Sequence, residues 1–208
     1  MKKIVIIDYL INNLWSVQSA LNSLGYNYKI SNDIEVIKDS SHLILPGVGS
    51  FRLAMLNIKK LRIDEAIKSS LNNGSKILGI CLGMQLLASK GYEDGNTEGL
   101  NLINAEVKKI NISKNKNKIK IPHVGFNSVE FNEKSNLFKG INNYCDFYFV
   151  HSFVLSINKL TNDHLISTCN YGETFISSVE YKNIYGTQFH PEKSQKNGLK
   201  IIKNFINL

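Results

Sequence analysis

The sequence predicts an α/β fold: one domain with a doubly wound, mostly parallel sheet, helices on both faces and an added antiparallel strand region. Short apolar runs alternate with helix-like patterns in the first half, which is typical of parallel strands joined by crossover helices. The chain has 208 residues, of which 43% are hydrophobic, so it is long enough to bury one full core. No linker or internal repeat interrupts it, and residues 1–208 are assigned to one domain.

The elements of the first half follow from the spacing of apolar residues and from the residues that stop each segment. Four buried strands are expected, at Ile4–Asp8, Tyr28–Ser31, His42–Leu45 and Lys76–Ile80. Helices are expected at 14–24, Phe51–Lys60 and Asp64–Asn72, with Gly25 and Gly74 as stops. This order predicts the parallel part of the sheet.

Turns rather than helices separate the apolar runs of the second half. Strands are expected at Ala105–Ile110, Ile119–Ile121, Ser128–Phe131, Asp146–His151, His164–Asn170, Phe175–Glu180 and Ile184–Phe189. A final helix is expected at Gln195–Ile206. This change of character predicts the added antiparallel region.

Cysteine usage and hydropathy indicate a cytoplasmic protein. The three cysteines are an odd number without a C-x-x-C pair, so neither a disulfide framework nor a structural metal site is expected. Cys145 and Cys169 are expected to pack in the core. No run of eighteen apolar residues occurs, and the short apolar N-terminus is expected to be a buried strand rather than a signal peptide.

The formal net charge is +8, and much of the excess lies between Lys108 and Lys120. A nucleic-acid-binding segment is one interpretation. A solvated hairpin with a lysine-rich edge is the other, and it is preferred because no aromatic residues interleave with these lysines. We therefore expect no nucleic-acid partner and no membrane.

The segment Lys76–Leu87 predicts a nucleophile elbow. An apolar strand runs into Cys81, small residues flank it, and an apolar helix pattern follows at once. A helix N-terminus places partial positive charge beside the sulfur, which favours the thiolate. It also offers backbone N–H groups, such as that of Leu82, to a developing oxyanion.

A base for this thiol is expected near the carboxyl end of another strand. His190 directly follows the apolar run Ile184–Phe189, and catalytic groups in such sheets lie at carboxyl strand ends. If this strand neighbours Lys76–Ile80, the imidazole of His190 and the thiol of Cys81 can meet. Glu192 stands two residues further on, where its carboxylate can orient the imidazole. A lone histidine at a strand end is more often structural, but the elbow and the carboxylate spacing favour a triad.

These segments resemble the class I glutamine amidotransferase family, and within it the glutaminase subunits of imidazole glycerol phosphate synthase. The elbow and the His190-Pro191-Glu192 motif carry the resemblance. Further matching motifs are Pro46-Gly47-Val48-Gly49-Ser50-Phe51, Pro122-His123-Val124-Gly125-Phe126-Asn127 and His151-Ser152-Phe153. They follow the family's order along nearly the whole chain.

The resemblance implies a role for each matching residue. Cys81 attacks the carboxamide of glutamine, His190 acts as acid and base, and Glu192 orients it. Oxyanion donors are expected at Leu82 and in the Val48–Gly49 segment, where the Val48 peptide flips. Substrate contacts are expected from Gly47, Gln85, Glu93, Ser152 and Phe153. Three simpler interpretations stay open: Gln85 as a surface polar residue, Ser152 as a strand-end residue, and the glycines as parts of a tight turn.

The resemblance also implies a partner and no cofactor. Ammonia released from L-glutamine passes to a cyclase subunit of (β/α)8 type within a heterodimer, where it serves histidine biosynthesis. Matching interface positions are Pro122, His123, Phe126, Asn127 and Lys193, although Lys193 also fits a plain solvated charge.

Two aromatic positions depart from the family pattern and favour other functions. Phe126 stands where the family usually has Trp, and Phe153 where it has Tyr, so each lacks a polar group. Paralogues that supply ammonia to sugar amidination in surface polysaccharide synthesis are therefore a second hypothesis. A cysteine peptidase and a non-catalytic scaffold come from other classes. The peptidase leaves the accessory motifs unexplained, and the scaffold does not require an intact triad.

Overall fold

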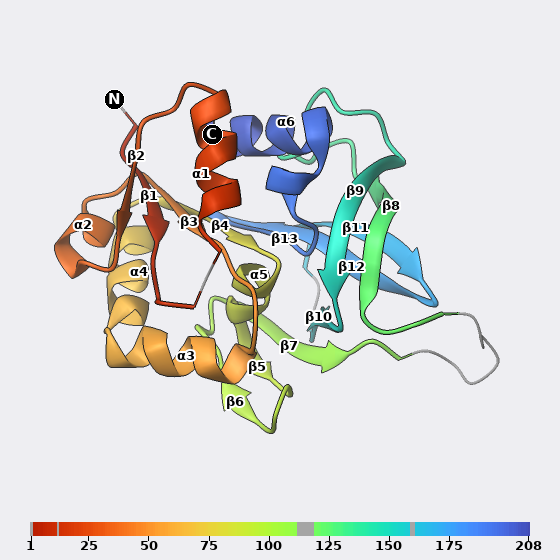
Figure 1. The fold of residues 1–208 in the computed structure, drawn as a ribbon, viewed down its shortest axis with the longest axis horizontal. Coiled ribbons are helices and arrows are strands. Elements are labelled where there is room, and N and C mark those ends of the chain that lie inside the picture. The colour runs from red at the N-terminus through yellow and green to blue at the C-terminus, as the bar shows by residue number, and fades with distance from the viewer. Residues whose placement is uncertain (1, 12, 112–118, 159–160) are drawn as a thin grey trace.

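The computed structural model describes residues 2–11, 13–111, 119–158 and 161–208, and it contains two sheets. The larger sheet has nine strands in the order β2-β1-β3-β4-β13-β12-β11-β8-β9. It runs across the whole molecule in Figure 1, and the smaller sheet, β10-β7-β5-β6, lies below it in that view. The predicted α/β fold with an added antiparallel region is confirmed.

Five strands form the parallel part of the large sheet. They are β2 (Tyr28–Ser31), β1 (Ile4–Ile7), β3 (His42–Leu45), β4 (Lys76–Ile80) and β13 (Ile184–Thr187). All pairs among them are parallel, and Tyr185 of β13 lies beside Leu78 of β4. The expected neighbours β4 and β13 are therefore adjacent, so their carboxyl ends meet at one edge.

The antiparallel part continues from β13 through four more strands. They are β12 (Glu173–Tyr181), β11 (His164–Tyr171), β8 (His123–Phe131) and β9 (Cys145–His151). The small sheet contains β10 (Phe153–Ile157), β7 (Ile103–Lys109), β5 (Ala88–Gly91) and β6 (Thr97–Glu98). Ser152 alone separates β9 from β10, so the chain passes from one sheet to the other at this residue.

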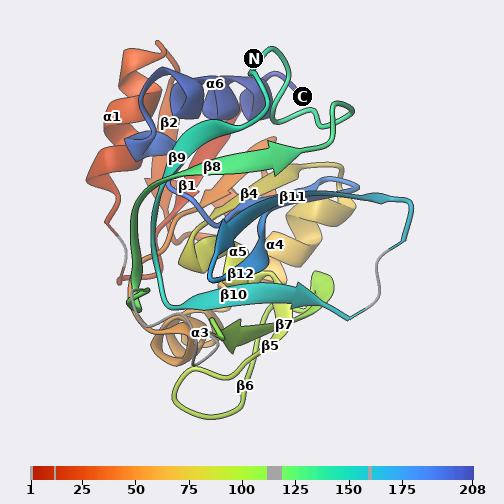
Figure 2. The same ribbon diagram turned by 90° about the vertical axis from the view of Figure 1, so that its right-hand side faces the viewer.

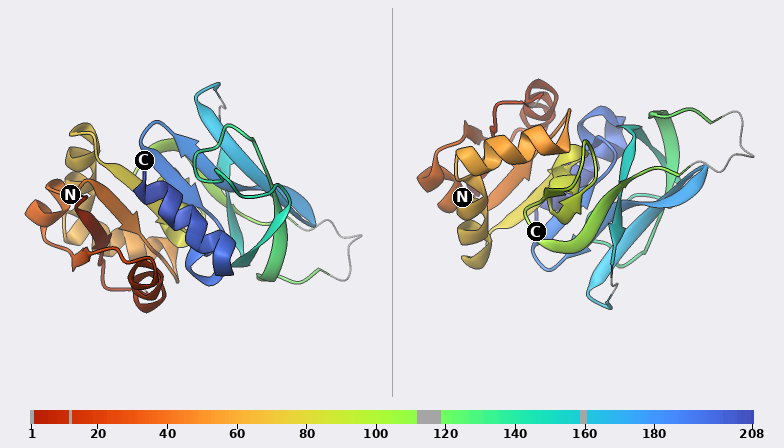
Figure 3. Two further views of the ribbon diagram at one scale, coloured as in Figure 1. Left: turned by 90° about the horizontal axis from the view of Figure 1, so that it is seen from above. Right: turned by 90° about the horizontal axis from the view of Figure 1, so that it is seen from below.

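Helices cover both faces of the parallel part, as Figures 2 and 3 show. On one face, α1 (Trp15–Ser23) and α6 (Gln195–Ile206) pack against β1, β3 and β4. On the other face lie α2 (Ile34–Lys38), α3 (Phe51–Lys60), α4 (Ile63–Asn72) and α5 (Leu82–Leu86). A 3-10 turn, η1 (Pro191–Lys193), precedes α6. None of the helices in these described ranges is long and apolar enough to cross a membrane.

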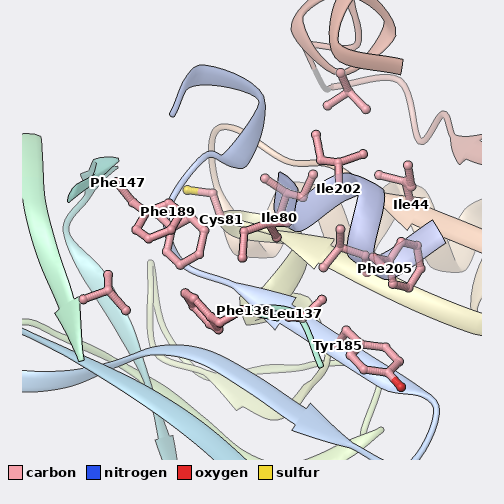
Figure 4. Close-up of a cluster of buried hydrophobic side chains, with 14 of the residues drawn as sticks. Ile44, Ile80, Cys81, Leu137, Phe138, Phe147, Tyr185, Phe189, Ile202 and Phe205 are labelled. Atoms are coloured by element: carbon pink, nitrogen blue, oxygen red, sulfur yellow. The ribbon is translucent and has the colours of Figure 1, made fainter. Parts of the chain in front are cut away.

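Each face of the sheet has its own apolar core because alternate strand residues point to opposite sides. In β1, Ile4 and Ile6 belong to one core, and Val5 and Ile7 to the other. Figure 4 shows Cys81 beside Ile80 and Phe189, within the core that α6 covers. Cys81 therefore stands at the edge of a packed apolar core.

The remaining cysteines lie as expected from the sequence. All three cysteines are free, and Cys169 is buried while Cys145 is half-buried against the same core. Burial raises the pKa of the Cys169 thiol to about 12, which leaves it neutral.

Several short elements were not predicted, and one prediction is wrong. The missed elements are α2, β5, β6, β10 and the 3-10 turn η1, and each has five residues or fewer. Too few turns or alternations fit into such lengths to give a periodic pattern. The expected strand Ile119–Ile121 does not form, and the chain enters β8 only at His123, after Pro122, which has no N–H to give to a ladder. The expected hairpin between Lys108 and Lys120 includes residues 112–118, which lie outside the described residues.

Glycines permit an unusually close contact between α5 and the parallel strands. A Cβ atom at Gly83 would lie 1.8 Å from the Leu45 carbonyl oxygen of β3. A Cβ at Gly79 would lie 2.6 Å from the Gly83 carbonyl oxygen. Both obstacles are backbone atoms, which cannot rotate away. The helix after Cys81 can therefore rest on β3 and β4 only with glycine at these positions.

We predict that Gly83→Ala destabilises the fold by more than about 3 kcal/mol, because β3 and α5 must separate. Gly74→Ala is the matched control. Gly74 has φ +91° with no atom within 4 Å of an added Cβ, so it adds only backbone strain of about 1 kcal/mol. Urea unfolding of both variants measures the difference. Equal destabilisation by the two changes would contradict the close-contact argument.

Candidate active site

Cys81 occupies the strained turn that a nucleophile elbow requires. It stands between β4 and α5 with φ 54° and ψ −109°, which a non-glycine residue rarely adopts. The backbone N–H of Gln85 donates to the Cys81 carbonyl at 3.2 Å, so the helix begins at once. This turn brings the thiol to the carboxyl end of β4, with the first turn of α5 beside it.

The His190–Ser194 turn is held by bonds to strand β9. The His190 N–H donates to the Tyr148 carbonyl at 2.9 Å, and the Tyr148 N–H donates to the Ser194 hydroxyl oxygen at 2.9 Å. The Ser194 hydroxyl in turn donates to the His190 carbonyl at 2.6 Å. These bonds fix where the imidazole and the Glu192 carboxylate project.

The buried His190 and Glu192 side chains form an ion pair, with Nδ1 2.7 Å from Oε1. Burial acts to lower the pKa of His190, but the Cys81 thiol and the Glu192 carboxylate outweigh it and raise the pKa well above its usual value. Since Nδ1 is taken by Glu192, Nε2 is left for the thiol. Nε2 has no hydrogen-bond partner among the described residues, and the raised pKa favours a protonated imidazole beside Cys81.

A cavity of about 270 Å³ opens over the thiol, and most of the sequence-predicted site residues line it. Predicted residues in its wall are Val48, Gly49, Cys81, Leu82, Gln85, Glu93, Pro122, Ser152, Phe153 and His190. Val150 and His151 complete the lining. The chain contributes these residues from six separate segments, so the cavity depends on the whole fold.

Glu93 is anchored at the start of α3. Its Oε2 accepts the backbone N–H of Phe51 at 2.8 Å, and the Ser50 hydroxyl caps the same helix. The carboxylate also lines the cavity that contains Cys81. Glu93 therefore links the start of α3 to the wall of the cavity that contains Cys81.

A second, much smaller cavity of about 10 Å³ lies on the other side of His190. Gly47, Glu192 and Lys193 line it, and so does Val48, which borders both cavities. A Cβ at Gly47 would lie 2.6 Å from the Tyr9 hydroxyl oxygen and 2.8 Å from the Gly83 nitrogen. Glycine is thus needed at position 47 for space, whereas Gly49 is needed for its φ of +98°.

The predicted interface residues divide into exposed and buried ones. Pro122 and Lys193 are exposed, and Phe126 is 51% exposed with its ring against Tyr148. Asn127 is half-buried and donates from Nδ2 to the Asn170 carbonyl at 3.0 Å.

His123, which was expected at the interface, is buried in the structure. Its side chain is only 2% exposed, because strand alternation turns position 123 inward while positions 122 and 124 face outward. The ring lies between Phe149 and Tyr171, and its Nδ1 is 3.1 Å from His151 Nε2.

Two residues near Cys81 were not given roles from the sequence. Gln188 is fully buried, with Nε2 3.6 Å from Cys81 Sγ, and His151 lines the cavity. The sequence contained one indication of the position of Gln188. It stands two positions before His190, and in an extended backbone residues two positions apart point to the same side. Burial lowers the pKa of His151 to about 3 and that of His123 to about 4, so both are neutral at pH 7.

Comparison with known sequences identifies the family. Residues 5–208 match the Glutamine amidotransferase class-I family. The chain belongs to the class I glutamine amidotransferase family. Relatives within this family include imidazole glycerol phosphate synthase subunit HisH 1 of Campylobacter jejuni, 44% identical over 99% of this chain and 100% of the relative. The HisH subunit of Lactococcus lactis is 45% identical over 99% of this chain and 98% of its own length.

Solved structures show the same fold. A putative GMP synthase subunit from Thermoplasma acidophilum superposes with a TM-score of 0.72, at 22% identity, over 100% of this chain and 93% of that one. PurLQS from Thermotoga maritima gives 0.69 at 18% identity, over 100% of this chain and 99% of that one. The central sheet with helices on both faces is therefore the fold of other glutamine amidotransferases.

We predict that Cys81→Ala lowers the pKa of His190. The thiol is one of the two groups that raise this pKa against burial, so removing it leaves Glu192 to oppose burial alone. The imidazole signals in an NMR pH titration report the midpoint, with the unchanged protein as reference. An identical midpoint in both proteins would show that the two side chains are not coupled.

Proposed function

We propose that the chain is the glutaminase subunit of imidazole glycerol phosphate synthase, acting in histidine biosynthesis in the cytoplasm as one glutaminase domain. Cys81, His190 and Glu192 are its triad. The observation that carries the proposal is one cavity in which the elbow cysteine and the His190–Glu192 pair meet the expected substrate residues. Membership of the glutamine amidotransferase family supports glutamine as the substrate.

The reaction begins with the thiolate of Cys81, which attacks the carboxamide carbon of glutamine. The carbon–nitrogen bond then breaks, and the imidazolium of His190 gives its proton to the leaving nitrogen, so that ammonia departs. A glutamyl thioester stays on the sulfur. Water attacks this thioester, His190 takes a proton from the water, and glutamate leaves while the thiolate is restored. Glu192 holds the imidazole orientation throughout.

The cavity wall also supports assignments for substrate binding. Both side-chain N–H groups of Gln85 are taken, by the Phe153 carbonyl at 2.9 Å and by Gln188 Oε1 at 3.0 Å. Gln85 therefore offers substrate only its Oε1, an acceptor suited to an ammonium or amide N–H. Glu93 supplies negative charge for the α-ammonium group. Backbone N–H groups at Ser152 and Phe153 suit the α-carboxylate.

Oxyanion stabilisation falls to the first turn of α5 and to the loop before α3. The Leu82 N–H lies at the N-terminus of α5, directly after the nucleophile. Val48 and Gly49 line the same cavity from the opposite loop. Gly49 already adopts a positive φ, so the peptide between these two residues can rotate without a Cβ clash.

The relatives are named as one subunit of a synthase, and we assign a partner subunit to this chain as well. We propose a (β/α)8 cyclase that receives the ammonia. Exposed apolar side chains lie on α1, which packs against η1, in the cavity wall and against Tyr148: Trp15 is 73% exposed, Val48 39% and Phe126 51%. Lys193, at 6.0 Å from the Tyr148 ring centroid, adds a positive charge next to Phe126 and Tyr148. An exposed apolar surface with a charged neighbour is typical of a docking face.

We predict that Cys81→Ala abolishes glutamine-dependent synthesis by the complex, while synthesis from added ammonium salts continues. The variant removes the nucleophile and leaves the partner's own site intact. Glutamate release and acceptor turnover are measured separately with a cyclase partner. Glutamine-driven turnover by the variant would disprove the nucleophile assignment. If the unchanged protein supports glutamine-driven turnover only with a sugar amidotransferase as partner, the polysaccharide pathway is favoured instead.

We predict that the isolated subunit hydrolyses glutamine slowly and that the loaded partner accelerates it by on the order of 10²–10³, the value of one oxyanion donor. The partner must bind the state with the rotated Val48 peptide more tightly to have this effect. Glutamate release is measured alone, with the partner, and with the partner plus its acceptor. An isolated subunit that already works at the full rate would show that the oxyanion site is preformed.

A further inference from the structure

Gln188 touches the nucleophile but has no role in the mechanism above. Its side chain is fully buried, and its Nε2 lies 3.6 Å from Cys81 Sγ. A second neighbour of the sulfur is the Val150 carbonyl oxygen, at 3.7 Å. A carbonyl oxygen can only accept, so it favours the neutral thiol, whereas an amide N–H favours the thiolate. Whether these two neighbours favour the thiol or the thiolate of Cys81 therefore depends on which end of the Gln188 amide faces the sulfur.

One backbone carbonyl settles this orientation. The Phe153 carbonyl oxygen accepts only, so the Gln85 side-chain atom 2.9 Å away must be the NH2 group. The same NH2 group lies 3.0 Å from Gln188, and the Gln188 atom there must be its oxygen. The NH2 group of Gln188 is consequently the end that points at Cys81.

The same carbonyl also fixes the neighbouring histidines. His151 Nδ1 lies 3.0 Å from the Phe153 oxygen, so this nitrogen carries the proton and Nε2 is left as an acceptor. His123 Nδ1 donates to it at 3.1 Å. A continuous chain of hydrogen bonds, His123–His151–Phe153–Gln85–Gln188, thus ends at the sulfur, and each donor direction in it is determined.

We propose that Gln188 is a further catalytic residue, whose side-chain N–H donates to the Cys81 thiolate and whose orientation is set by Gln85 and the Phe153 carbonyl. The inference rests on the proposed function, since it assigns a role within that reaction. The N–H group stabilises the resting thiolate against the Val150 carbonyl. It also holds the sulfur at the cavity end of β4, ready for attack.

The other groups near the sulfur act differently. Titratable groups that face Cys81 among the described residues are His190 with Glu192 behind it, Tyr9, His151 and Glu93. His190 stabilises the thiolate by charge, and His151 is neutral. Burial and then the neighbouring Cys81 raise the pKa of Tyr9, which therefore stays a neutral phenol. Of these groups and Gln188, only His190 takes part in proton transfer to the substrate.

The test is Gln188→Met, which keeps an unbranched side chain and removes the amide. The rate of Cys81 alkylation by iodoacetamide is measured against pH, and a Cys81→Ser protein corrects for Cys145 and Cys169. Loss of one hydrogen bond to a charged group shifts the midpoint upward by about one to two pH units. The kcat for glutamine falls about tenfold or more. KM changes less, because Gln188 does not line the cavity wall.

Thr187→Val is the matched control, since Thr187 ends β13 directly before Gln188. Its buried Oγ1 has no hydrogen-bond partner among the described residues, and valine keeps the shape. This variant should retain the alkylation midpoint and the kcat of the unchanged protein. A folded Gln188→Met protein with an unshifted midpoint overturns the proposal, because a merely structural residue would change stability and leave the thiol titration alone.

A measurement on the unchanged protein decides the matter if Gln188→Met does not fold. The 15N and 1H signals of the Gln188 side-chain amide should move with pH at the midpoint found by alkylation. A flat titration overturns the proposal. Neither titration uses glutamine, so a chain without glutaminase activity would disprove the proposed function while the amide titration still judges this inference.

Discussion

The contact between the first turn of α5 and the parallel strands is the constraint on which the site depends. Gly83 lets the helix rest on the Leu45 carbonyl, and Gly79 lets it rest on its own strand. Gly47 brings the loop after β3 against the same turn. If the helix lay further out, the dihedral angles of Cys81 would relax and the thiol would leave the cavity. The strain at Cys81 is thus maintained by packing at three glycines rather than by hydrogen bonds to the cysteine side chain.

The cavity wall is organised in a different way, through polar atoms. The Phe153 carbonyl accepts from Gln85 and from His151, and so it ties α5 to the junction between β9 and β10. That junction joins the large sheet to the small one at Ser152. The N–H groups of Ser152 and Phe153, to which we assign substrate binding, need such support, because this stretch of chain has no strand partner on both sides. Buried polar networks with every donor assigned give this kind of rigidity.

Sequence patterns predicted the parallel strands and the His190–Glu192 pair well because both are local signals. Runs such as Tyr28–Ser31 and His42–Leu45 are bounded by turn residues, and the observed strands have the same limits. The His190-Pro191-Glu192 spacing predicted an ion pair that needs only one turn of chain. Proximity of Cys81 to His190 required one further assumption, that β4 and β13 pair, and the register confirms it.

The parts that could not be predicted depend on pairings between distant segments. The burial of His123 follows from the register of β8 against β9, which its own sequence does not contain. In the sequence, Gln188 is an ordinary polar residue. Its orientation follows only from its hydrogen bond with Gln85 and from the hydrogen bond between Gln85 and the Phe153 carbonyl. β5 and β6 are short and gain their hydrogen bonds from β7 and from each other. Such features arise from tertiary context, so propensity and periodicity carry little information about them.

The position of β13 has a consequence for how the protein is made. This strand joins the parallel and antiparallel parts, and it carries the chain to Gln188, which is 107 positions after Cys81. During synthesis the elbow and its supporting helices leave the ribosome long before β13 can insert between β4 and β12. Until then β4 is a sheet edge, and the thiol lacks its base. A nascent chain therefore exposes an unpaired strand but cannot yet release ammonia, so its early risk is aggregation rather than wasted glutamine.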